Sequence, residues 1–194
     1  MRTFSIVCDN TTMQTKSGSH NWRPVPGATT SRLQRRWLTR PGALTQGLRG
    51  LGCLTLEVLS ETVCCARPEE SGRLGLPSGH ALWQREVCLL VSGVACIVAQ
   101  SVTPLAATQG HWQALRRLRN RPLADILYQD RAIARSNFEF TTLRAGMPLY
   151  RLIQAKQASN TRLYARRSVF LRAGQPLLVA EAFLPAFWRL AKDS

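Results

Sequence analysis

The sequence predicts an α+β domain built on a single six-stranded antiparallel sheet. Six short segments show the apolar alternation or the β-branched enrichment that is typical of strands, and most are joined to their neighbours by short turns. Strands joined by tight turns, with helices grouped between them, favour an antiparallel sheet over a parallel one. The six candidate strands are residues 54–58, 85–91, 94–103, 132–140, 163–172 and 176–184.

One folded domain is expected. The chain has 194 residues, of which 45% are apolar, and this is enough for a single sizeable core. Residues 1–20 are polar and lack periodicity, so we expect them to be a disordered extension. The folded domain should therefore span residues 21–194.

Two helices are predicted ahead of the first strand. Residues 30–38 form the first. In the second, Leu44, Leu48 and Leu51 recur at i, i+4 and i+7, and Gly52 stands where a glycine often ends a helix.

The strands form two predicted hairpins. The first joins residues 85–91 to 94–103 through a Ser-Gly turn, and the second turns at residues 173–175. A loop rich in Pro, Gly and Glu is expected over residues 66–80. Between the hairpins, helices are expected over 111–119, from Pro122 to Tyr128, and over 148–156.

The formal net charge of +15 raises the possibility of a nucleic-acid or acidic-membrane partner. In the densest basic run, residues 116–121, the arginines share a stretch with Trp112, Leu115 and Leu118 at helical spacing. That pattern is typical of the solvated side of an amphipathic helix. No nucleic-acid partner is therefore expected, and a positive field would equally attract a small dianion.

No targeting or metal-binding motif is present. The amino terminus lacks the apolar core of a secretory signal, and no apolar run reaches the roughly 20 residues that a membrane span needs. We expect a cytoplasmic protein, and peripheral membrane contact stays open. The six Cys and three His show no zinc spacing, so no metal site is predicted. The motifs of nucleotide binding, zinc proteolysis and serine hydrolysis are also missing.

Two charges stand on strand faces that should be apolar. Alternation places Glu181 with Val179 and Phe183, and Arg85 with Val87. One explanation is that the two charges lie near strand ends or pair with each other, as buried charges usually must. The other is that both face one apolar cavity and meet a ligand there, since Arg offers a fork to a carboxylate and Glu can accept from a hydroxyl.

The chain resembles the chorismate lyase family of ubiquinone biosynthesis in four stretches. The most specific match is R-R-S followed by a Gly turn and P-L-L-x-x-E-x-F-L-P. The matching stretches are residues 38–51 (LTRPGALTQGLRGL), 83–104 (WQREVCLLVSGVACIVAQSVTP), 118–128 (LRNRPLADILY) and 163–185 (LYARRSVFLRAGQPLLVAEAFLP).

The resemblance implies a monomeric carbon–oxygen lyase that converts chorismate to 4-hydroxybenzoate and pyruvate without a cofactor. It also implies helices on one face of the six-stranded sheet and flap-like helical segments that enclose the site. The family's product-binding residues fall on Arg85, Leu123 and Glu181, and a further product neighbour falls on Leu44. We hypothesise that Arg85 clamps the ring carboxylate, Glu181 engages the hydroxyl, and the two leucines wall the ring.

The chain departs from the family pattern at two places. Ser92-Gly93-Val94-Ala95-Cys96 replaces the usual D-G-x-P-W, and Gln100 stands where an Arg is usual. Both departures spare Arg85 and Glu181. The alternative function is a non-catalytic effector-binding module of the same fold, as in a class of transcription regulators. Those regulators carry an upstream winged-helix domain, which the roughly 40 largely polar residues before the first matched helix should not supply.

Overall fold

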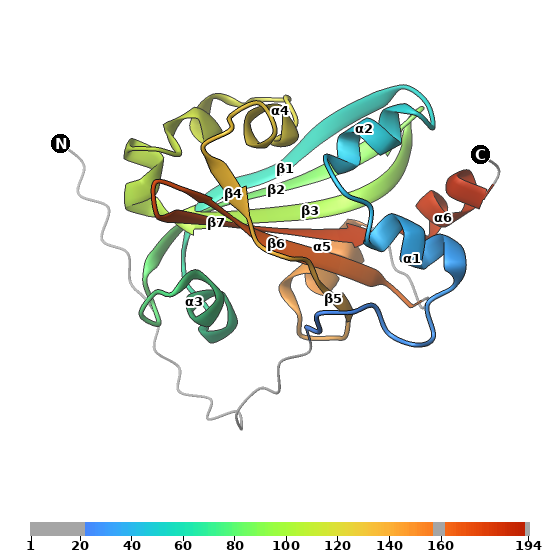
Figure 1. Cartoon of the computed structure of the whole chain (residues 1–194), viewed down its shortest axis with the longest axis horizontal. Coiled ribbons are helices and arrows are strands. Elements are labelled where there is room, and N and C mark those ends of the chain that lie inside the picture. The colour runs from blue at the N-terminus through green and yellow to red at the C-terminus, as the bar shows by residue number, and fades with distance from the viewer. Residues whose placement is uncertain (1–21, 157–161, 193–194) are drawn as a thin grey trace.

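The computed structural model describes residues 22–156 and 162–192, so the extension predicted over residues 1–20 lies outside the described residues. One antiparallel sheet has the strand order β1-β2-β3-β7-β6-β4, and β5 also pairs with β6 (Figure 1). The strands are β1 (Leu54–Cys65), β2 (Ala81–Val91), β3 (Val94–Pro104), β4 (Ile133–Arg135), β5 (Glu139–Thr142), β6 (Tyr164–Arg172) and β7 (Gln175–Phe183).

Six α-helices and two 3-10 helices accompany the described sheet. The α-helices are α1 (Arg32–Leu38), α2 (Leu44–Arg49), α3 (Pro68–Leu74), α4 (Ala124–Leu127), α5 (Pro148–Lys156) and α6 (Pro185–Lys192). The 3-10 helices are η1 (Leu105–Gln109) and η2 (Gln113–Arg117). None of the helices among the described residues is long and apolar enough to span a bilayer.

The sheet has seven strands, and the predicted six is wrong by one because residues 132–140 do not form a single strand. Arg135 pairs with Phe170, whereas Glu139 pairs with Arg167, so one extra residue is inserted between the two short strands. At the break, the backbone N–H of Ser136 donates to the Val169 carbonyl at 2.8 Å, and its Oγ accepts from the Val169 N–H at 3.0 Å. A bulge thus divides the predicted strand into β4 and β5.

Both predicted hairpins are present. Their turns, Ser92-Gly93 and Ala173-Gly174, have positive φ angles of 48° and 81°, and of 48° and 76°. Positive φ at both central residues is the geometry that matches the twist of the flanking strands. The strand β1 runs past its predicted end because an irregularity between Val58 and Ser60 reverses the alternation without ending the pairing with β2.

Four of the five predicted helices are present. Helices α1, α2, α4 and α5 lie where they were predicted. The expected helix over 111–119 is instead a run of 3-10 turns, and α6 was not predicted. The predicted loop over 66–80 contains α3, where the Glu70 side chain caps the Arg67 N–H and Gly75 ends the helix in the left-handed conformation. Its Pro, Glu and Gly are helix-terminus signals rather than loop signals.

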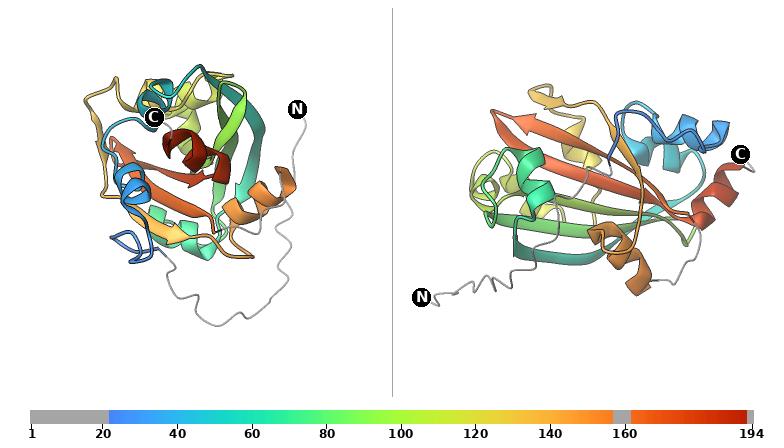
Figure 2. Two further views of the ribbon diagram at one scale, coloured as in Figure 1. Left: turned by 90° about the vertical axis from the view of Figure 1, so that its right-hand side faces the viewer. Right: turned by 90° about the horizontal axis from the view of Figure 1, so that it is seen from below.

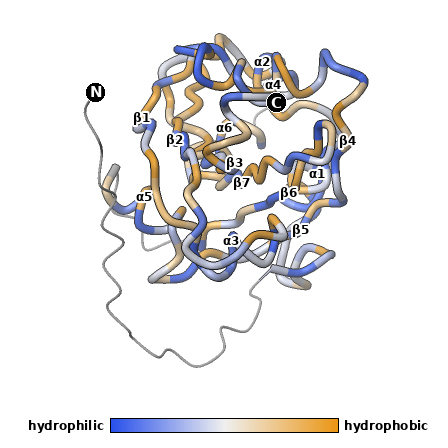
Figure 3. The backbone as a smooth tube through the Cα atoms, turned by 90° about the vertical axis from the view of Figure 1, so that its left-hand side faces the viewer, coloured by the Kyte–Doolittle hydropathy of each residue, from blue (hydrophilic) through white to orange (hydrophobic). Residues whose placement is uncertain are grey.

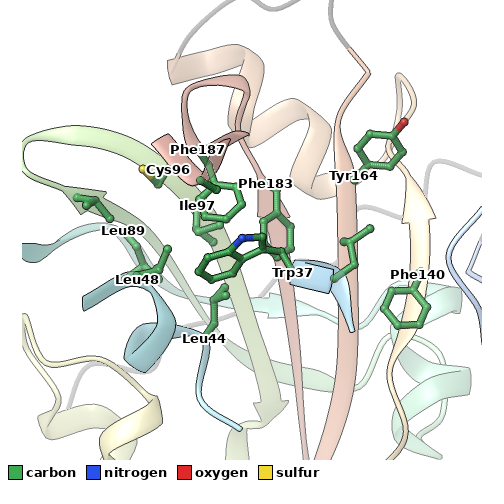
Figure 4. Close-up of a cluster of buried hydrophobic side chains, with 13 residues drawn as sticks. Trp37, Leu44, Leu48, Leu89, Cys96, Ile97, Phe140, Tyr164, Phe183 and Phe187 are labelled. Atoms are coloured by element: carbon green, nitrogen blue, oxygen red, sulfur yellow. The ribbon is translucent and has the colours of Figure 1, made fainter. Parts of the chain in front are cut away.

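Helices cover both faces of the sheet, not one as predicted (Figures 1 and 2). On one face, α1, α2 and α6 pack into the cluster of Figure 4, and η2 and α4 pack beside it. On the other face, α5 packs against Cys88, Val98 and Ala182, and α3 packs against Leu178. The central strand β3 carries buried apolar residues on both faces, since the neighbours Ile97 and Val98 are both fully buried, so each face needs a cover. Figure 3 shows the hydropathy of each residue along the chain.

Candidate active site

A largely apolar pocket lies between the first of these faces and the helices α2 and α4. The space between its walls, with the open solvent at its mouth included, is about 710 Å³. The structure brings all four predicted site residues into it: Arg85 from β2, Glu181 from β7, Leu44 from α2, and Leu123 from the turn before α4. The expected flap-like cover corresponds to α2 and to the segment that leads into α4.

The floor of the pocket separates the two predicted charges. On β3, Ser101 lies opposite Arg85, and Ala99 lies opposite Glu181. These small side chains leave open space between the guanidinium and the carboxylate, and Val179 continues the apolar surface. Arg85 and Glu181 therefore enter the pocket from β2 and β7, on opposite sides of a strand with small residues.

The Arg85 side chain is held by groups at the rim. Only 2% of the residue is exposed, its Nε lies 3.2 Å from Glu61 Oε1 on β1, and its Nη2 donates to the carbonyls of Arg119 and Arg121. Burial lowers the pKa of Arg85, and the nearby Glu61 carboxylate opposes that shift. The Nε–H is not aligned for a hydrogen bond with Glu61, so this contact is an ion pair without a hydrogen bond.

Glu181 pairs with an arginine that the sequence analysis missed. Arg166 on β6 donates from Nε to the Glu181 carboxylate at 2.7 Å, and its Nη1 donates to the carbonyls of Trp37, Leu38 and Arg40 at 3.1 to 3.4 Å. Arg166 is 1% exposed, whereas the Glu181 side chain is 19% exposed. Arg166 thus orients Glu181 and fixes the connection between α1 and α2.

Neither explanation offered for Arg85 and Glu181 holds in its simple form. They do not pair with each other, because β3 lies between their strands. Neither depends on a ligand for its only counter-charge, because Glu61 pairs with Arg85 and Arg166 pairs with Glu181. Both nevertheless line one apolar pocket, as the second explanation required.

Tyr128 closes part of the mouth. Its hydroxyl donates to the Gly42 carbonyl at 2.8 Å and accepts from Arg135 Nη1 at 3.0 Å. Partial burial raises the pKa of Tyr128, and the charge of Arg135 opposes this. The hydroxyl joins the α1–α2 connection, the end of α4 and β4 above the pocket. No pattern in the sequence indicated this role.

The two departures from the family pattern are both accommodated. Cys96 is fully buried in the cluster of Figure 4, where Ile97 and Phe187 also pack. Gln100 donates from its amide to Glu86 Oε1 at 3.1 Å, and Gln84 donates to the same oxygen at 2.9 Å. A neutral amide network therefore satisfies Glu86.

Taken together, the fold and the pocket define a single-sheet α+β domain whose apolar pocket carries an arginine and an arginine–glutamate pair, groups with the chemistry to recognise a small organic acid. Solved structures share the fold. The C-terminal domain of PhnF has a TM-score of 0.55 and 19% identity over 73% of this chain and 87% of that chain. The effector domain of PhnF from Mycobacterium smegmatis has a TM-score of 0.53 and 14% identity, covering 75% of this chain and 90% of that chain. At these identities the likeness shows the fold alone.

Sequence similarity is far more specific. The family model described as chorismate lyase matches residues 21–192. A probable chorismate pyruvate-lyase of Bordetella avium is 50% identical over 156 residues, which are 80% of this chain and 79% of that protein. A probable chorismate pyruvate-lyase 1 of Pseudomonas fluorescens is 39% identical over 170 residues, 88% of this chain and 92% of that protein. The chain belongs to the chorismate lyase family.

Proposed function

We propose that this pocket is the active site in which the chain, a carbon–oxygen lyase by its family, converts chorismate to 4-hydroxybenzoate and pyruvate. One observation carries the proposal. Arg85 and the Arg166–Glu181 pair open into the same apolar pocket from opposite sides of its small-residue floor. A ring with a carboxylate at one end and a hydroxyl at the other fits that arrangement. The family's product feeds ubiquinone synthesis.

The reaction needs no oxidant. The ring carbon that carries the hydroxyl loses a proton, and the electrons of that C–H bond form a ring double bond. The neighbouring carbon–oxygen bond breaks, its electrons leave with enolpyruvate, and the ring becomes aromatic. Enolpyruvate takes up a proton on its methylene carbon to become pyruvate. The protein's task is mainly to hold one reactive conformer in place and away from water.

The proposed roles follow from the contacts. Arg85 lines the pocket, and its guanidinium offers several donors in a fixed fork, which suits it to take the ring carboxylate. Glu181, oriented by Arg166, accepts from the ring hydroxyl. Leu123 and Leu44 pack on the ring. Because the product keeps the carboxylate and the hydroxyl, the same contacts should retain it, and product release should be slow.

We extend the proposal to the whole chain. Residues 21–194 form the catalytic domain, and residues 1–20 take no part in catalysis. The protein acts as a monomer in the cytoplasm without a cofactor, and every group assigned a role in the pocket comes from one chain.

The test is direct turnover of chorismate by the purified protein without added metal. We expect 4-hydroxybenzoate and pyruvate in equal amounts, measured by absorbance and by a coupled pyruvate assay. An effector-binding module, the function that the shared fold of the PhnF domains would favour, should bind an organic acid without turnover. Binding without product would overturn the lyase proposal.

The assignment of Arg85 has its own test. Arg85→Met removes the guanidinium, and the loss of a hydrogen bond to a charged group should weaken binding of 4-hydroxybenzoate about 10- to 100-fold. Isothermal titration measures the change, and a melting curve checks that the variant is folded. Unchanged affinity in a folded variant would remove Arg85 from the site.

A further inference from the structure

One buried hydroxyl in the pocket has no partner. Thr45 lies in the first turn of α2 and lines the pocket, and only 5% of the residue is exposed. Its Oγ1 is buried and makes no hydrogen bond with any residue that the structure describes. Buried polar groups in native proteins almost always have a partner, so an exception beside a ligand pocket calls for an explanation.

The helix itself cannot satisfy this hydroxyl in the usual way. A threonine inside a helix commonly donates to the carbonyl three or four residues earlier. Thr45 is the second residue of α2, so those positions are Pro41 and Gly42, ahead of the helix. The Gly42 carbonyl already accepts from the Tyr128 hydroxyl at 2.8 Å. No described residue bonds the Thr45 hydroxyl, and the pocket that it lines is the place where another partner could reach it.

Contacts of α2 with α4 show which way this side of the helix faces. Residues four apart share a helix face, so Thr45 lies on the same side of α2 as Arg49. Arg49 pairs with Asp125 of α4 at 3.8 Å, which places that side of α2 toward α4. The segment before α4 is also where Arg85 donates to the carbonyls of Arg119 and Arg121. Thr45 and Arg85 both line this pocket, from α2 and from β2.

We propose that Thr45 binds substrate and product by donating a hydrogen bond from its hydroxyl to the ring carboxylate that Arg85 holds. A carboxylate has two oxygens and accepts several donors. Because Arg85 Nη2 is occupied by backbone carbonyls, the guanidinium alone leaves acceptor sites on that carboxylate open. This inference rests on the proposed site and adds a third polar group to it.

The experiment compares Thr45→Val with Thr45→Ser. Valine keeps the shape and removes the donor, whereas serine keeps the donor. We expect Thr45→Val to weaken 4-hydroxybenzoate and benzoate about 10- to 100-fold in isothermal titration, the range for a hydrogen bond to a charged group. Thr45→Ser should stay within about threefold of wild type. Binding of 4-methylphenol, in which a methyl group replaces the carboxylate, should be the same in wild type and Thr45→Val.

Stability separates this role from a structural one. Because the hydroxyl has no partner, Thr45→Val should melt at or above the temperature of the wild-type protein. The matched control is Thr108→Val, outside the pocket, whose buried hydroxyl donates to the Leu105 carbonyl at 2.7 Å and accepts from Arg116 Nε at 3.0 Å. That control should lower the melting temperature and leave the affinity for 4-hydroxybenzoate unchanged.

The outcomes are distinct. If the wild-type protein does not bind 4-hydroxybenzoate, the proposed function fails. If it binds and Thr45→Val binds equally well, only the role of Thr45 fails. An equal loss of affinity for 4-methylphenol and 4-hydroxybenzoate would also overturn it, because the contact would then not be to the carboxylate.

Discussion

Arg166 and Arg167 are neighbours on β6, and both are buried. They point to opposite faces of the sheet and have different partners. Arg166 lines the pocket and bonds Glu181 and the carbonyls of the α1–α2 connection. Arg167 lies on the far face, where it bonds Glu139 at 2.7 Å and Glu69 at 2.6 Å. Two arginines on one strand thus have different roles. Arg166 helps to form the pocket, whereas Arg167 stabilises the fold on the other face of the sheet.

The surroundings of the two arginines differ in a second way. The carboxylates paired with Arg167 reach solvent, since the Glu69 side chain is 45% exposed. The Trp37 and Leu38 carbonyls paired with Arg166 are buried with it. Water can replace Arg167 more readily than it can replace Arg166, because an uncompensated buried group costs more than an exposed one. The comparison predicts that loss of Arg166 harms both stability and activity, and loss of Arg167 harms stability alone.

Replacing Arg166 should have the largest effect. Arg166→Met removes the donor that bonds Glu181 and the carbonyls of Leu38 and Arg40, which should cost about 3–5 kcal/mol of unfolding free energy. The same change frees the Glu181 carboxylate, so kcat/KM for chorismate should fall about 100-fold or more. Urea unfolding and steady-state rates measure the two effects. A stable and active Arg166→Met protein would contradict the proposed role of Arg166 in stability and activity.

Glu181→Gln tests the catalytic half of that effect. The amide keeps the size of the side chain and loses its charge, so kcat should fall about 100-fold while the protein remains folded. The control is Glu139→Gln, which removes a carboxylate of similar burial from Arg167 on the far face and should keep kcat within about twofold. Equal losses of kcat in the two variants would show that ion pairing, and not the position in the pocket, sets the rate.

The position of Arg166 could have been predicted. Alternation along β6 places Arg166 with Tyr164 and Ser168, the same argument that placed Glu181 on β7. The two-residue turn at 173–174 then fixes the register of the hairpin and sets Arg166 opposite Glu181. The turn residues therefore predict the register of the hairpin, and the register predicts the pair of Arg166 and Glu181.

The partner of Arg85 could not have been predicted in this way. Glu61 lies opposite Arg85 only because β1 continues past an irregularity after Val58, and a helix separates β1 from β2. The carbonyls of Arg119 and Arg121 come from a segment of 3-10 turns and coil that the helical period described wrongly. Contacts between distant segments depend on bulges and loop paths that no short pattern encodes.

Arg167→Met tests the role of the arginine on the far face of the sheet. It removes two ion pairs whose carboxylates stay partly hydrated, so we expect a loss of about 2 kcal/mol in unfolding free energy. At a temperature where the variant is folded, kcat and the affinity for 4-hydroxybenzoate should match those of the wild type. A fall in kcat of tenfold or more in the folded variant would mean that Arg167 affects catalysis in the pocket from the far face of the sheet.

The smallest effect is expected at Tyr128, where a single hydroxyl joins segments on the pocket side of the sheet. Tyr128→Phe removes the bonds to the Gly42 carbonyl and to Arg135, which should cost about 1 kcal/mol and raise the release rate of 4-hydroxybenzoate a few-fold. The contribution of the Tyr128 hydroxyl to stability should also depend on pH. Because the pKa of Tyr128 is raised in the folded protein, the unfolded chain releases this proton first as pH rises above about 10. The folded state then binds more protons, so stability falls with rising pH in that window. Denaturant unfolding of both proteins between pH 9 and pH 11, values chosen about the ordinary tyrosine pKa, should show a steeper alkaline loss in the wild type than in Tyr128→Phe. Parallel curves would mean that the hydroxyl is no more buried in the folded protein than in the unfolded chain, and that the mouth of the pocket is held by other contacts.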